Sequence, residues 1–150
     1  MTELEAVADA VLAAHSTGRP AGVPALAEWS GIAVEAGDLP VGTLVWGEET
    51  VKRVGGSEGP LAHRAIRLRV EYLTRTLTGP PAVSAQRAAE PLRAWCVKAL
   101  AGNRLGGLAV ELAEVGTSRK LEQAELPFAR TVVEFDLVYT STYNDLERQV

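Results

Sequence analysis

The chain of 150 residues contains a single cysteine, Cys96, two histidines and only 5% aromatic residues. One cysteine cannot form an internal disulfide, so nothing in the sequence requires an oxidising compartment. His15 and His63 are isolated along the chain, and no pair of histidine or cysteine residues has the spacing of metal ligands. The sequence therefore predicts neither a metal site nor another cofactor.

Long hydrophobic runs and an excess of basic charge are also missing. The longest apolar segments are far too short to cross a bilayer, so no membrane partner is expected. The N-terminus, MTELEAVADAVLAAH, carries acidic residues where a signal peptide needs basic ones, and we expect it to belong to the fold of a protein made in the cytoplasm. Fifteen Lys and Arg against nineteen Asp and Glu give a net charge of −4, which argues against a broad phosphate-binding surface.

The composition is that of an ordinary globular domain. Hydrophobic residues make up 47% of the chain and charged residues 23%. Because 150 residues is a common size for one domain with one core, we expect residues 1–150 to form a single domain. The polar segment 141–150, STYNDLERQV, is expected to be an extended C-terminal tail.

The first part of the chain predicts one helix followed by a long irregular segment. Thr2 and Glu5 fit a capping box, and apolar residues then recur at helical spacing to about Ala14. Glycine and proline interrupt every period between residues 15 and 39, so we expect a loop there with at most one short strand, around Glu28 to Val34.

Two strands and a second helix are predicted next. VGTLVW, after Pro40, starts a strand that continues towards Val51. From Arg64 to Thr74 apolar and polar residues alternate, which predicts one core face and one polar face. Residues 83–100 carry an apolar helical stripe with Ser84 as the N-cap; Pro91 predicts either a kink or a regular helix that starts at about Glu90.

The last third predicts a hairpin of Leu105 to Val115 and Pro127 to Thr140, with the polar residues 116–126 as the connection. The side chains expected on the core face are Leu108, Val110, Leu112, Val133, Phe135, Leu137 and Tyr139. If both arms face one core, Glu111, Glu134 and Asp136 must all lie on the opposite, acidic face. The order α-β-β-α-β-β predicts an α+β fold, with a largely antiparallel or mixed four-stranded sheet and helices packed on one face.

No residue pattern in the chain favours catalysis. Cys96 lies on the apolar helix stripe and is expected in the core, and no Ser, His and Asp combination has a local frame such as GxSxG. We expect a protein that is not an enzyme. Arg67 and Arg69 project from the polar face of one strand and are candidates for a phosphate contact or for an ion pair with a neighbouring subunit, although such rows are more often simply solvated.

Several sequence segments, taken together, resemble those of a known protein family. They are Asp38-Leu39-Pro40 leading into VGTLVWGEE, a strand ending in RLRVEY, an alanine-rich helix closing before LGGLAVELAEVGT, and FARTVVEFDLVYTSTYND. In element order, over about Asp38 to Asp145, the chain resembles the tail terminator proteins of long-tailed phages, the minor tail protein U-like or tail completion proteins. Pro91 and the connection SRKLEQAELP depart from the family pattern.

The resemblance implies a structural virion protein at the head-proximal end of the tail, assembled in the host cytoplasm. Such subunits form a ring, usually a hexamer, that caps the tail tube, stops its polymerisation and offers a docking surface to the head-completion or connector protein. DNA passes through the ring without specific binding. The alternatives are another head-tail joining or tail tube subunit, or an α+β binding module unrelated to phages.

If the protein is a tail terminator, its polar segments are candidates for contact with a neighbouring subunit or with the tube. The segment 116–127 is expected as the hairpin tip and 141–150 as a polar tail. The candidate interface residues are Arg67, Arg69, Arg119, Lys120, Glu122, Glu125, Tyr143, Asn144 and Asp145. The candidate acidic residues facing the lumen are Glu111, Glu134 and Asp136, which would discourage adhesion of DNA.

Overall fold

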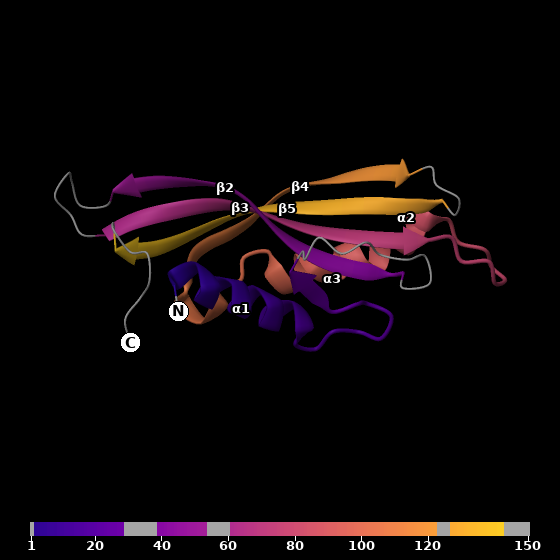
Figure 1. The fold of residues 1–150 in the computed structure, drawn as a ribbon. Helices are drawn as coiled ribbons and strands as arrows, with labels where there is room; N and C mark the ends of the chain where they lie inside the picture. The colour runs from indigo at the N-terminus through magenta and orange to yellow at the C-terminus, as the bar shows by residue number, and fades with distance from the viewer. Residues whose placement is uncertain (1, 29–38, 54–60, 123–126, 143–150) are drawn as a thin grey trace.

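The computed structural model describes residues 2–28, 39–53, 61–122 and 127–142. In these ranges a single twisted sheet carries its helices on one face (Figure 1). The opening helix α1 spans Glu3–Ser16 and begins as predicted. The backbone N–H of Glu5 donates to the Thr2 hydroxyl at 3.0 Å, and the Thr2 N–H donates to the Glu5 carboxylate at 2.6 Å. This capping box satisfies donors that a helix start otherwise leaves unpaired.

The sheet has five strands in the order β1-β2-β3-β5-β4. Their bounds are β1 Leu26–Glu28, β2 Val41–Arg53, β3 Leu61–Arg75, β4 Ala109–Glu122 and β5 Phe128–Thr142. β1 pairs with β2 in parallel, and the other neighbours are antiparallel. The predicted α+β class is confirmed, whereas the predicted count of four strands is wrong because three residues of the long loop add an edge strand. That strand lies earlier than predicted and shares only Glu28 with the expected range; residues 29–38 lie outside the described part.

Proline determines where the second helical segment becomes regular. A short helix α2 spans Ala85–Ala88, and α3 spans Glu90–Leu100 with Pro91 in its first turn. A proline there loses no helical hydrogen bond, because the first N–H groups of a helix have no partner within it. Of the two predicted outcomes, the structure has the regular helix starting at Glu90. Ser84 caps α2 as predicted, accepting from the Arg87 N–H at 3.2 Å.

β4 differs most from its prediction. The strand runs to Glu122, so residues 116–122 of the expected connection 116–126 are part of the sheet. The pairing with β5 shifts at Val110 and again at Val115, which marks two β-bulges. Each extra residue reverses the face of those before it, so Leu108 and Val110 are exposed while Ala109 and Leu112 are buried. The predicted common face of Leu108, Val110 and Leu112 is therefore wrong.

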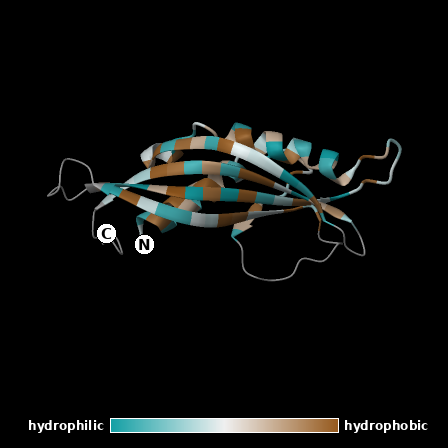
Figure 2. Ribbon diagram, turned by 90° about the horizontal axis from the view of Figure 1, so that it is seen from above, coloured by the Kyte–Doolittle hydropathy of each residue, from teal (hydrophilic) through white to brown (hydrophobic). Residues whose placement is uncertain are grey.

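The core lies between the helices and one face of the sheet. β3 buries Ile66, Leu68, Val70 and Tyr72, and β5 buries Val133, Phe135, Leu137 and Tyr139, both as predicted. Figure 2 shows the corresponding alternation of hydrophobic and hydrophilic residues along the strands. α1 packs on α3 and β1, and α2 packs on β3, β5 and β4. A 3-10 turn, η2, at Leu105–Gly107 leads into β4.

Gly42 in β2 is the glycine whose missing side chain matters most for packing. A Cβ atom there would lie 2.8 Å from Leu26 Cδ2 and 3.1 Å from Tyr72 Cε1. We expect Gly42→Ala to lower the free energy of unfolding by about 1–3 kcal/mol, because the Tyr72 ring is buried and cannot retreat. The matched control is Gly116→Ala in β4, where the space around a Cβ is open. Urea unfolding of both variants checks this; equal stability of the two would contradict the packing argument.

Candidate functional site

The open face, the face of the sheet without helices in the described ranges, carries the side chains that the sequence singled out. Arg67 and Arg69 of β3 pair in register with Asp136 and Glu134 of β5. Glu111 of β4 pairs with Val138 and shares this face. The predicted placement of all five side chains opposite the core is confirmed.

Arg67 connects two carboxylates across the strands. Its Nε donates to Asp136 Oδ1 at 2.7 Å, and its Nη1 donates to Glu134 Oε2 at 2.8 Å. Arg69 Nε lies 3.8 Å from the other oxygen of Glu134. The hydrogen bonds to Glu134 and then to Asp136 raise the pKa of Arg67, and the guanidinium is a cation.

A second set of ion pairs continues towards the β4 edge. Arg130 of β5 contacts Glu71 of β3 at 2.5 Å and Glu122 of β4 at 3.4 Å. Lys120 Nζ lies 3.6 Å from the same Glu122. We call these contacts, with those of Arg67 and Arg69, the ion-pair ladder. The ladder spans β3, β4 and β5, and the charges within it alternate in sign and pair with one another.

The ladder changes the expectation of an acidic surface. Glu134 and Asp136 lie on the predicted face, but Arg67 holds both carboxylates. Parity along a strand predicts which face a side chain occupies, whereas the register between strands decides its partner. The face is therefore mixed in charge and not uniformly acidic.

The candidate interface residues of the expected hairpin tip occupy different surroundings. Arg119, Lys120 and Glu122 are strand residues of β4, which corrects their placement in a loop. Lys120 and Glu122 join the ladder, whereas Arg119 lies on the helix side and reaches Glu90 of α3 at 3.4 Å. The remaining candidates, Glu125, Tyr143, Asn144 and Asp145, lie outside the described residues.

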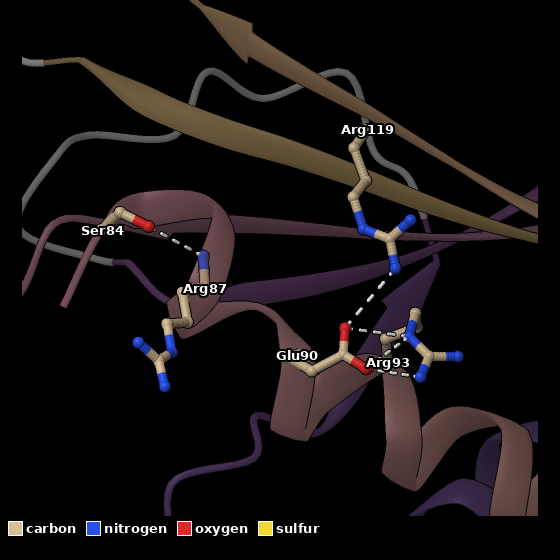
Figure 3. A network of polar contacts seen from close by, with 5 residues as sticks. All are labelled: Ser84, Arg87, Glu90, Arg93 and Arg119. Atoms are coloured by element: carbon tan, nitrogen blue, oxygen red, sulfur yellow. Dashed lines mark hydrogen bonds and ion pairs between the residues drawn. The ribbon is translucent and has the colours of Figure 1, made fainter.

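Glu90 is the centre of a cluster of arginines on the helix side (Figure 3). Arg93 Nε lies 3.0 Å from both carboxylate oxygens of Glu90. These hydrogen bonds from Arg93 lower the pKa of Glu90, and those from Arg119 add to the effect. Arg87, one turn earlier, is exposed, and its guanidinium has no partner among the described residues.

A buried polar cluster beneath the sheet has no counterpart in the sequence predictions. His15 Nε2 lies 2.7 Å from the Tyr72 hydroxyl, and Trp95 Nε1 donates to the His15 carbonyl at 2.8 Å. His15 Nδ1 is buried and finds no partner in the described ranges. Burial, and then the charge of Arg19, lower the pKa of His15 to about 4. The signal in the sequence was the position of His15, which continues the buried stripe Val7, Val11 by four residues.

Cys96 is buried next to this cluster, as predicted for a core residue. Burial raises the pKa of its thiol to about 12, so the thiolate that a nucleophile needs is not formed at neutral pH. Among the described residues no group of three His, Cys, Asp or Glu is arranged to hold a metal ion. None of the helices in these ranges has the length and apolar character needed to span a membrane.

No protein-family model matches the chain, and no curated protein matches it either.

The pKa of His15 leads to a prediction on acid stability. An exposed histidine in the unfolded chain takes a proton near pH 6.5, whereas the buried one stays neutral until about pH 4. The unfolded state therefore binds more protons between these values, and the free energy of unfolding falls as the pH falls through them, by an amount of order 3 kcal/mol.

His15→Gln removes this titration and keeps a polar group near Tyr72, so its urea-unfolding stability is expected to depend less on pH between 7 and about 4 than the wild type does. His63→Gln is the control, because His63 is only partly buried on the open side of β3. If His63→Gln flattens the profile and His15→Gln does not, the assignment to the buried cluster is wrong.

Proposed function

We propose that the protein is a ring-forming structural subunit of the phage tail terminator type, which caps the head-proximal end of a tail tube. The observation that carries the proposal is a sheet whose helices, within the described residues, all lie on one face, while an ion-pair ladder lies on the other. This architecture adds physical support to the sequence resemblance over about residues 38–145. The ring, expected as a hexamer, would stop tube polymerisation and offer a docking surface to the head-completion or connector protein.

The two edges of the sheet suit a head-to-tail ring. One edge is β1, a strand of three residues, and the other is β4, a strand of fourteen. A surface that pairs with a different surface on the next copy forms a ring when the rotation closes, whereas a self-complementary patch forms a dimer. The two edges of this sheet differ from one another, as the two surfaces of a head-to-tail contact do.

The open face suits the lining of a passage for DNA. The guanidinium groups of Arg67 and Arg130 each engage two carboxylates, so they are not free to bind phosphates. Steady contact with the sugar-phosphate backbone depends on available basic groups. The ladder would therefore let DNA slide past over the middle of this face, while the exposed cations Lys52 and Arg75 lie near the strand ends. This mixed face replaces the simpler idea of an acidic wall.

The closest alternatives are a tail tube or other head-tail joining subunit and a binding module with no role in phages. A tube subunit stacks without limit, whereas a terminator adds once. We expect that adding the protein to polymerising tube protein of the particle that carries it shortens the tubes and places density at one end only in electron micrographs. Incorporation along the whole tube would favour the tube-subunit alternative, and tubes unchanged in length would favour the binding module.

The role of the ladder can be tested separately. Glu134→Gln with Asp136→Asn leaves Arg67 without its carboxylates, so we expect non-specific binding of duplex DNA that weakens steeply with added salt. The control is Glu114→Gln, which changes an exposed carboxylate on the other side of the sheet, in register with Phe135. Fluorescence anisotropy of labelled DNA measures both. Equal binding by the ladder variant and the control would exclude a role of the ladder in preventing adhesion.

A further inference from the structure

Exposed aliphatic side chains are concentrated along one edge of the sheet. Six large hydrophobic residues of the described ranges are exposed, and four of them, Leu108, Val110, Val115 and Leu121, lie on β4 or directly before it. Val110 and Val115 are the residues at the two bulges. An unpaired edge strand with apolar side chains is a ready site for association with another chain.

The helix side next to this edge is basic. α2 and α3 contain Arg87, Arg93 and Lys98 against one acid, Glu90. Arg119 of β4 joins Arg93 around Glu90, as Figure 3 shows. Glu114 of β4 is a second acid on this side, so four cations face two acids. We call the helix side of the β4 edge, with Arg87 and Arg119, the basic side of the molecule.

The other edge carries the opposite charge. α1 contains Glu3, Glu5 and Asp9 and no Lys or Arg, and it packs on β1. Asp9 is exposed, and so is Glu28 of β1, which pairs with Leu44 and therefore lies on the helix side. We call α1 and β1, with Asp9 and Glu28, the acidic side.

We propose that the basic side of one copy docks onto the acidic side of the next copy. The inference rests on the proposed function, because it names the head-to-tail contact of the ring. The strand directions agree with it: β2 and β5 both run antiparallel to β3, and β4 runs antiparallel to β5. If the next copy has the same orientation, its β1 therefore runs antiparallel to β4 of the first copy. All neighbouring strands within the sheet are antiparallel as well, except β1 and β2.

Charge favours a second copy docked head to tail over a second copy related by two-fold symmetry. Pairing β4 with β4 of a second copy would bring two basic sides together, and pairing the two acidic sides would be equally repulsive. Opposite charges on the two edges favour the head-to-tail arrangement and disfavour both symmetric ones.

The test uses two variants of the full chain that reverse charge on one side each. The first is Arg87→Glu with Arg119→Glu, and the second is Asp9→Lys with Glu28→Lys. We expect the wild type to associate with rising concentration in sedimentation velocity, more weakly at high salt. Each variant alone should need at least about tenfold higher concentration, because it brings like charges together.

Loss of association in both single variants distinguishes a head-to-tail contact from a symmetric one, because a symmetric contact uses only one of the two sides. In an equimolar mixture the sides of unlike variants are again opposite in charge, so the mixture should recover the association that each variant alone has lost. Val115→Ser, at an exposed bulge, tests the apolar part without adding charge and should weaken association without lowering stability. The control is Lys52→Glu with Arg75→Glu, two exposed cations on the open face, which should associate like the wild type.

A wild type that stays monomeric at every concentration would overturn the inference, as would a mixture that recovers no association. Binding of the charged surfaces to tube protein alone, with no contact between copies, would also overturn it. Failure of the proposed function is distinguishable: chains that associate through these two sides and leave tube ends uncapped would reject the terminator role while the contact stands. If all variants cap tubes equally well, the proposed contact between copies is wrong while the terminator role stands.

Discussion

The alternation of apolar and polar residues on β3 and β5, the two central strands, is the constraint from which the rest of the structure follows. Val70 faces Val133 and Leu68 faces Phe135 in register, while the alternate residues Arg67 and Arg69 face Asp136 and Glu134. Side chains alternate strictly between the faces of a sheet, so one register fixes both the core and the ladder. A slip of one residue would expose the core and bury the ion pairs.

The ladder contributes more to the charge pattern of the surface than to the free energy of unfolding. Exposed ion pairs are worth about 0–1 kcal/mol each, because water and salt screen them and two long side chains must be held in place. The aliphatic and aromatic side chains buried beneath the helices supply the larger contribution. The cross-strand pairs instead hold cations and carboxylates in fixed positions on the open face.

The local sequence pattern is sufficient to predict the central strands and the helix ends. The capping box at Thr2 and Glu5, Pro91 in a first helical turn and the alternation of β3 each act within a few residues. β4 was predictable only in part, because a bulge is set by strand pairing and reverses the faces assigned from spacing. The strand at Leu26–Glu28 follows from its fit against Gly42, where the absence of a Cβ lets Leu26 approach, and such a contact between distant segments has no local signature.

The candidate site, too, is predictable from the sequence only in part. Parity along the strands placed Arg67, Arg69, Glu111, Glu134 and Asp136 on one face, but their pairing needed the register between β3 and β5. The polar neighbours of Arg119 predict a loop, and only its pairing with Thr131 shows that it lies in a strand and on the helix side. The contact between His15 and Tyr72 joins residues 57 positions apart, beyond the reach of any local pattern.

The measurement that tests the central claim most directly is electron microscopy of tail tube ends incubated with the protein, combined with its mass in solution by light scattering. The account predicts a single closed ring of copies on one end of each tube, with the open face of the sheet towards the channel. A protein that leaves the tube ends bare and stays monomeric would contradict it.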